Sequence, residues 1–140
     1  MLRPAVLLIG GLSAAAAGAE DAPRHIPLDE WRTLVDGRVL HYEADGRYVG
    51  REYYLPGSNR ARFESADGTC GDGVWTYLEE SRAYCFRWPW DTFCFHHLER
   101  ADGSLAISTV TPAGDPVPST PQDIVSITKD VFICGTENLS

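Results

Sequence analysis

The stretch from Gly68 to Phe95 constrains the fold more than any other part of this chain. It contains three of the four cysteines and three of the four tryptophans. Aromatic residues alternate with other residues between turn-forming positions. Alternation with a period of two is typical of β-strands that bury one face. The stretch therefore predicts a β-meander that is held together by disulfides.

Two turns define the register that we expect in this meander. If Glu80-Ser81 and Pro89-Trp90 are the central pairs of two hairpins, six aromatic side chains share one face of a three-stranded sheet. These side chains belong to Trp75, Tyr77, Tyr84, Phe86, Phe93 and Phe95. A slip of one residue would move them all to the other face.

The cysteine positions predict two disulfides. The register places Cys85 directly opposite Cys94 on the non-aromatic face, where directly opposed cysteines can bond. Cys70 and Cys134 would then form the second disulfide. A bond from Cys70 to Cys85 or to Cys94 remains the alternative.

A short helix precedes the β-structure. Four apolar residues between Leu28 and Val35 fall on one helical face, and Gly37 suits the position just after the helix. Because such a helix is too short to be stable alone, we expect Trp31 to plug one end of the fold. Residues Glu20–Ile26 are expected to be a flexible terminus.

The chain after Gly37 is expected to be all β. The predicted strands are Arg38–Glu43, Tyr48–Leu55, Ala61–Ser65, Gly73–Glu79, Ala83–Trp88, Thr92–Glu99, Leu105–Val110, Ile124–Thr128 and Val131–Cys134. A large aromatic sheet face must be covered, and closing the sheet covers it while removing exposed edges. We therefore predict a small antiparallel up-and-down, lipocalin-like β-barrel of about eight strands with one short N-terminal helix. A two-sheet β-sandwich is the alternative.

The N-terminus has the features of a signal peptide. Arg3 supplies a basic start, Ala5–Ala17 is mostly apolar, and small residues suit cleavage after Ala19. The apolar run is too short and too rich in glycine and alanine to span a membrane. We expect residues 1–19 to be removed and residues 20–140 to form one domain, periplasmic or secreted, without a membrane span. An uncleaved anchor is the alternative.

Charge and motifs narrow the function classes. The net charge of −8 disfavours nucleic-acid binding, because phosphates would be repelled. The sequence has no Gly-x-Ser-x-Gly motif, no phosphate-binding loop and no Cys-x-x-Cys motif. Glu52, Glu79 and Glu80 could supply paired carboxylates, but glycosidase chemistry needs two carboxyls across a cleft. We therefore predict no catalytic residue and no cofactor.

Two adjacent histidines invite a metal interpretation. His96 and His97 lie on one predicted strand, so their side chains point to opposite faces and do not easily share a metal. We expect His97 to edge the aromatic face and His96 to be solvated. No metal site is predicted.

Binding residues are expected at one hairpin tip and in one loop. Trp88 and Trp90 flank Pro89, and exposed aromatic side chains favour recognition. Thr111–Asp123 is rich in proline, including Pro118, and should form an extended surface loop with polyproline character. Of the two tryptophans, Trp90 is expected to be the more exposed.

The pattern Gly68-x-Cys70-x-x-Gly73-x-Trp75, followed by Cys85-Phe86-x-Trp88 and Cys94-Phe95, resembles that of small exported proteins of alphaproteobacteria. The resemblance covers about residues 28–100 and carries structural residues only. In size and class the acidic barrel is also similar to periplasmic inhibitors of proteases or lysozyme. We expect a periplasmic binding or inhibitor module of unknown partner, which presents loops to a protein or a small ligand; the alternatives are a carrier of a small hydrophobic ligand and an enzyme of the cell envelope.

Overall fold

The computed structural model describes residues 10–11 and 22–135. Within these residues the chain forms one helix and nine strands. In chain order they are β1 (Arg24–His25), α1 (Leu28–Val35), β2 (Val39–Ala44), β3 (Arg47–Tyr54), β4 (Arg60–Ser65), β5 (Cys70–Leu78), β6 (Ala83–Arg87), β7 (Thr92–Glu99), β8 (Leu105–Val110) and β9 (Gln122–Thr128). The expected signal peptide, residues 1–19, lies outside the described residues apart from Gly10 and Gly11.

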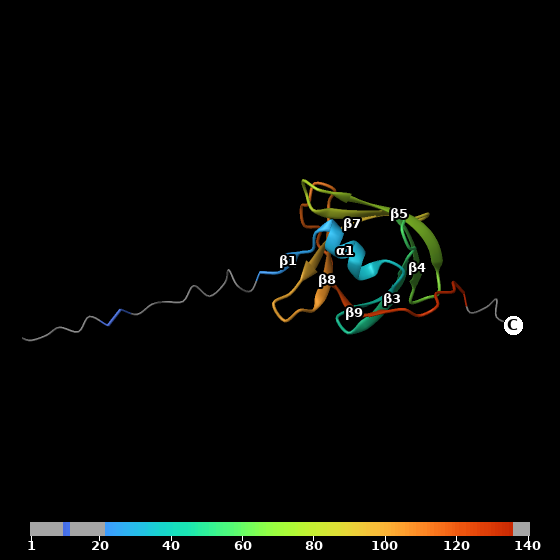
Figure 1. Cartoon of the computed structure of the whole chain (residues 1–140), viewed down its shortest axis with the longest axis horizontal. Coiled ribbons are helices and arrows are strands. Elements are labelled where there is room, and N and C mark those ends of the chain that lie inside the picture. Colours follow the sequence, from blue (N-terminus) through green and yellow to red (C-terminus); the bar gives the residue numbers. More distant parts are fainter. Residues whose placement is uncertain (1–9, 12–21, 136–140) are drawn as a thin grey trace, which may run out of the picture.

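Strands β2 to β9 form a closed up-and-down barrel. Each strand pairs antiparallel with the next along the chain, and β9 pairs back with β2 to complete the ring. Figure 1 is a view down the axis of this ring, with α1 across its opening. The predicted eight-stranded barrel is therefore confirmed, and the sandwich alternative is not formed.

The predicted register of the aromatic meander is confirmed. Trp75 pairs with Phe86 and Tyr77 with Tyr84 across β5 and β6, as a turn centred on Glu80-Ser81 requires. Across β6 and β7, Tyr84 pairs with Phe95 and Phe86 with Phe93, while the backbone N–H of Trp88 donates to the carbonyl of Asp91. Alternating side chains therefore place the six aromatic residues on the inner face of the barrel.

Both predicted disulfide pairs lie at bonding distance. The Cα atoms of Cys85 and Cys94 are 4.0 Å apart, and those of Cys70 and Cys134 are 5.8 Å apart. Cys85 and Cys94 pack with Ala83 and Val110 outside the aromatic core. Disulfides persist in oxidising compartments, so these pairs indicate a location outside the cytoplasm.

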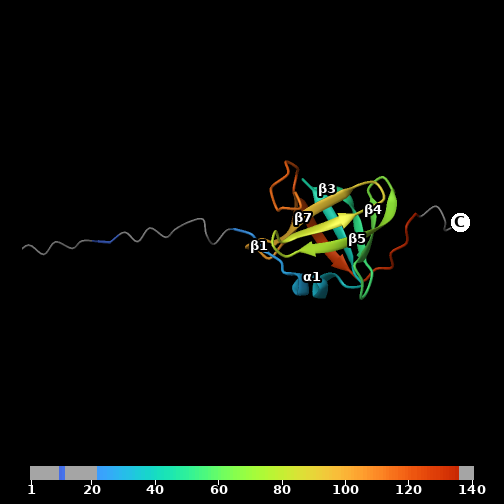
Figure 2. The same cartoon turned by 90° about the horizontal axis from the view of Figure 1, so that it is seen from above.

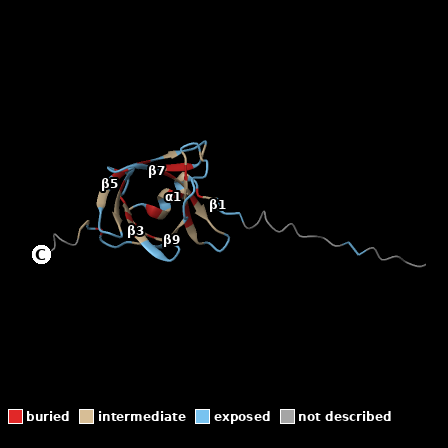
Figure 3. Cartoon of the chain, turned by 180° about the vertical axis from the view of Figure 1, so that it is seen from behind, coloured by how far each residue is buried: buried red, intermediate tan, exposed pale blue. Residues whose placement is uncertain are grey.

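Helix α1 closes one end of the barrel. It ends at Val35, and Gly37 follows with a φ of +69°, a conformation that glycine adopts without strain. Trp31 projects into the core with 0% of its surface exposed. Figure 2 shows α1 at one end of the barrel and the loop after β8 at the other, and Figure 3 shows the buried residues on α1. The expectation that Trp31 plugs one end is confirmed.

The segment before α1 is more ordered than predicted. Residues Glu20–Ile26 were expected to be flexible, but Arg24 and His25 form β1 against the end of β7, and Ile26 is buried. Strand β6 is shorter than β7, so β7 has an unpaired edge beyond the last β6 partner, and β1 occupies it. The phenol of Tyr84 donates a hydrogen bond of 2.9 Å to the carbonyl of Ile26.

The predicted strand Val131–Cys134 is wrong. These residues have no strand structure, although their apolar, β-branched composition favours one. Strand β9 already pairs with β2 and β8, so the closed barrel offers no free edge for another strand. The segment instead runs outside the barrel, where the guanidinium of Arg51 donates to the carbonyl of Ile133 and Cys134 bonds to Cys70.

Gly50 accompanies a bulge, a common position for a glycine inside a strand. The pairing of β2 with β3 shifts register between Tyr42 and Glu43, opposite Gly50. A side chain at Gly50 would overlap the backbone of Glu64 and the ring of Phe63. The bulge lets β3 bend around the barrel.

No helix within the described residues has the length and apolar character needed to cross a membrane.

Candidate ligand-binding cavity

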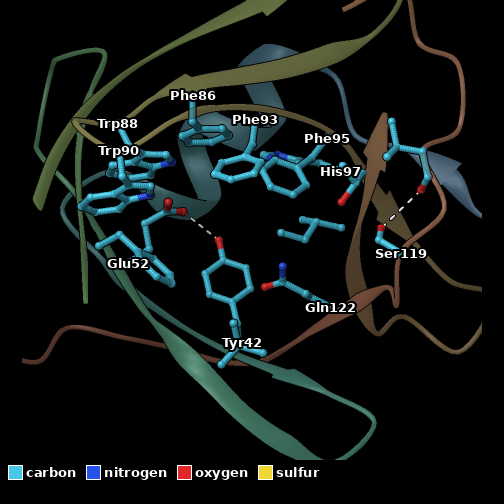
Figure 4. A pocket seen from close by; sticks show the side chains of 15 residues that line it. Tyr42, Glu52, Phe86, Trp88, Trp90, Phe93, Phe95, His97, Ser119 and Gln122 are labelled. Carbon is cyan, nitrogen blue, oxygen red and sulfur yellow. Dashed lines mark hydrogen bonds between the residues drawn. The ribbon is translucent and has the colours of Figure 1, made fainter. Parts of the chain in front are cut away.

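The barrel is hollow at the end opposite α1. A cavity of about 430 Å³ occupies this half of the interior and is shown in Figure 4. Its lining consists mainly of aromatic and aliphatic side chains with a few polar groups. The lining residues are Tyr42, Val49, Glu52, Phe63, Phe86, Trp88, Trp90, Phe93, Phe95, His97, Ile107, Thr109, Val117, Ser119 and Gln122.

One wall of the cavity is a column of three aromatic rings. The ring centroids of Phe86 and Trp88 are 5.8 Å apart, and those of Trp88 and Trp90 are 5.7 Å apart, with interplanar angles of 6° in both cases. Trp88 is 8% exposed, whereas Trp90 at the end of the column is 45% exposed. The column therefore runs from the buried interior to solvent at the open end.

Two glycines on β5 make room for this column. A Cβ atom at Gly73 would overlap the ring of Trp88, and one at Gly71 would overlap the ring of Trp90. Both glycines have the same side-chain parity as inward-facing Trp75. The tryptophan rings therefore lie directly on the backbone of β5, which leaves the centre of the barrel open.

Of the described residues that line the cavity, Glu52 is the only one with a carboxylate. It comes from β3 and is 5% exposed, and the phenol of Tyr42 on β2 donates a 2.8 Å hydrogen bond to its Oε1. Burial raises the pKa of Glu52 to about 7, although the Tyr42 hydrogen bond acts to lower it. The carboxyl therefore changes its charge near neutral pH.

His97 lies at the inner end of the cavity, between the hollow and the filled halves of the barrel. Its ring stacks on Tyr84 with centroids 4.0 Å apart and lies equally close to Trp31. Burial lowers the pKa of His97 well below 6.5, so the imidazole is neutral. Its buried Nδ1 has no hydrogen-bond partner among the described residues.

The proline-rich loop folds back over the open end. The hydroxyl and backbone of Thr111 bond to Asp115, and the N–H of Val117 donates to the carbonyl of Thr109. The expected extended loop is thus a compact turn followed by a return to β8. Val117 and Ser119 line the cavity, whereas Pro118 between them is exposed and does not.

The predicted binding residues have different places in this site. Trp88 and Trp90 both line the cavity, and Trp90 is the more exposed of the two, as expected. Pro118 lies in the proline-rich loop over the open end and does not line the cavity. Glu52 was considered only as a partner of Glu79 and Glu80, but the structure does not bring these carboxylates together, because Glu79 and Glu80 follow β5 at the α1 end.

The two adjacent histidines point to opposite faces, as expected. His97 is fully buried in the core, and not merely at its edge. His96 is not solvated: it is half-buried outside the barrel, and its Nε2 lies 2.9 Å from the carbonyl oxygen of Ser81. In the part of the chain that the structure describes, no three His, Cys, Asp or Glu side chains are grouped to hold a metal ion.

Sequence reasoning missed Glu52 as a cavity residue and the two glycines as seats for tryptophan rings. The signal for Glu52 was its position in the strand: side chains alternate between faces, so Glu52 shares the inward face of β3 with Gly50 and Tyr54. The signal for the glycines was their spacing of two before Trp75.

Comparisons of the chain with protein-family models, curated proteins and solved structures find no match. The resemblance to exported proteins of alphaproteobacteria therefore stays a prediction.

Proposed function

We propose that this protein binds a small, predominantly apolar ligand inside the barrel, and that it does so in the periplasm or as a secreted protein. The observation that carries this proposal is the hollow half of the barrel, about 430 Å³ in volume and walled by aromatic rings. Ligand sites of this kind are concave and mostly apolar, with a few polar groups that orient the ligand. Glu52, His97 and Gln122 would be those polar groups.

The other functions expected from the sequence have less support. Trp88 and Trp90 line the cavity, so their packing is explained without a protein partner, and the inhibitor role stays a prediction. Among the described residues, Glu52 is the one carboxylate that lines the cavity, whereas glycosidase chemistry uses a pair. An enzyme of the cell envelope therefore also stays a prediction.

A fluorescent probe can test binding in the cavity directly. We expect the full-length oxidised protein to bind the neutral probe N-phenyl-1-naphthylamine, with a rise and blue shift of its emission. Thr109→Trp, which fills part of the cavity from β8, should abolish this signal. Val125→Trp places the same side chain on an exposed position of β9 and should bind the probe like the wild type. Equal binding by both variants would place the probe outside the cavity and contradict the proposal.

A further inference from the structure

The Glu52 carboxyl has no basic partner in the cavity. None of the described lining residues is a lysine or an arginine, and the neighbouring strands place Leu40 and Phe63 opposite Glu52. An ionised carboxylate has room for about four hydrogen bonds, and the hydrogen bond that Glu52 receives from a side chain comes from Tyr42. A buried carboxylate needs a compensating positive charge or it takes up a proton. The described lining supplies no positively charged side chain, so a positive charge beside the ionised carboxylate would have to come from a ligand.

The aromatic walls around Glu52 also favour a positively charged ligand. The faces of aromatic rings carry negative electrostatic potential, and several such faces around one site bind organic cations. Phe86, Trp88, Trp90, Phe93 and Phe95 all line the cavity that Glu52 borders, and Figure 4 shows these side chains around it. Rings and carboxylate together repel an anionic ligand such as a fatty-acid carboxylate.

The charge of the whole chain acts in the same direction. A net charge of −8 raises the local concentration of cations and lowers that of anions. Three independent features, the unpaired carboxyl, the aromatic walls and the acidic surface, thus select the same ligand class.

We propose that the ligand of this cavity is an organic amine with an apolar or aromatic body, held with its ammonium group against Glu52 and its body among the aromatic rings. This inference rests on the proposed function, because it names the ligand class for the same cavity. It also gives Glu52 a role, that of the residue that determines specificity.

Binding of an amine should depend on pH. Tyr42, Tyr54 and His97 are the other titratable groups near Glu52; the pKa values of the tyrosines are raised well above 10 by burial, and that of His97 is lowered well below 6.5. Between pH 6 and pH 8 Glu52 is therefore the group of this set that titrates. An ammonium group stabilises the ionised carboxylate, so binding releases a proton, and affinity rises as the pH increases over this range.

Three indole compounds of nearly equal shape provide the test. Tryptamine is a cation, tryptophol is neutral and indole-3-acetate is an anion at pH 8. By isothermal titration calorimetry at pH 8, we expect the wild type to bind tryptamine about tenfold more tightly than tryptophol, a factor within the range of a desolvated cation–aromatic contact, and indole-3-acetate least. Glu52→Gln should remove the preference while retaining tryptophol binding. Glu80→Gln makes the same change in an exposed turn and should retain the preference.

The outcomes separate this inference from the proposed function. If N-phenyl-1-naphthylamine binds but tryptamine shows no preference, or Glu52→Gln keeps the preference, the cavity is a ligand site and the amine assignment is wrong. Tighter binding of indole-3-acetate would overturn the assignment in the same way. If neither the naphthylamine probe nor any indole binds, both proposals fail. At pH 6.5, where most of the Glu52 carboxyl is protonated, proton release on binding, measured in buffers of different ionisation enthalpy, should accompany tryptamine and not tryptophol.

Discussion

The two ends of this barrel contain the same kinds of inward-facing side chain, but one end is filled and the other is hollow. At the α1 end, Trp31 fills the interior: its ring centroid lies 4.0 Å from that of His97, 5.8 Å from Tyr84 and 5.9 Å from Tyr54. At the other end, inward-facing rings continue along β6 and β7, but they enclose a cavity of about 430 Å³. Aromatic side chains therefore line both halves of the interior, yet only the half next to α1 is filled.

The difference comes from a segment outside the barrel strands. Helix α1 places one large side chain, that of Trp31, inside the ring. The proline-rich loop covers the opposite end, and its Val117 and Ser119 line the cavity. The glycines of β5 add to the contrast, because they let Trp88 and Trp90 lie flat on the wall. Whether a small barrel is a packed core or a binding site thus depends on what enters from its ends.

The largest expected effect is the loss of the plug at the closed end. Trp31→Ala should reduce the free energy of unfolding by about 3–5 kcal/mol, because it removes a fully buried indole and leaves a cavity among packed rings. Trp90→Ala, at the open end, should cost much less, since Trp90 is 45% exposed. Urea unfolding followed by circular dichroism measures both. Similar losses for the two variants would show that the ends do not differ in packing.

The next effect is a pH dependence from Glu52. Its pKa is raised from an ordinary 4.5 to about 7, so between these values the folded protein binds one proton more than the unfolded chain. Stability contributed by the protonated carboxyl is present at low pH and lost as the pH rises. We expect the free energy of unfolding to fall by about 3 kcal/mol from this residue between pH 4.5 and pH 8.

Comparison of the wild type with Glu52→Gln isolates this contribution. The variant should unfold like the wild type near pH 5 and be more stable at pH 8, because the neutral amide cannot ionise. His97 acts in the opposite direction, since its lowered pKa makes stability increase with pH up to about 6.5 in both proteins. It therefore cancels in the difference. A difference between the proteins that does not change with pH would contradict the raised pKa of Glu52.

Much of the frame was predictable because it follows from local rules. Turn positions at Glu80-Ser81 and Pro89-Trp90 determine the register of β5 to β7, and the register determines which cysteines meet. The need to cover an aromatic face then predicts closure. These inferences need only side-chain alternation and turn geometry, both of which are written in a few neighbouring residues.

The errors and the missed site residues have non-local causes. Val131–Cys134 has the composition of a strand, and only the closed barrel shows that no edge is free for it. Strand β1 forms because β7 extends beyond β6 and offers a free edge. The residues of β1 itself, Arg24 and His25, give no sign of that edge. Alternation with Gly50 and Tyr54 places Glu52 on one face of β3, but only the closure of the barrel shows that this face lines a cavity. The cavity itself is the volume left after all side chains have packed.

A smaller effect tests how firmly the aromatic column is held inside the open half. Gly73→Ala should cost about 1–3 kcal/mol, because the new Cβ overlaps the ring of Trp88, which is 8% exposed and packs against Phe86 and Phe63. The shifted ring should also reduce binding of the naphthylamine probe. A variant as stable as the wild type, with unchanged probe binding, would show that the Trp88 ring can move freely.

The smallest effect is expected at the outer end of the same column. Gly71→Ala brings the new Cβ against the far end of the Trp90 indole, which lies at the mouth and can rotate toward solvent. The strain is therefore relieved, and alanine loses less conformational entropy than glycine in a strand, so the free energy of unfolding should change by less than about 1 kcal/mol. A red shift of tryptophan emission, absent when Trp90 is also replaced by phenylalanine, would report the rotated ring. If Gly71→Ala instead costs as much as Gly73→Ala, Trp90 is held as rigidly as Trp88. The packing of the aromatic rings would then not loosen between the α1 end of the barrel and its open end.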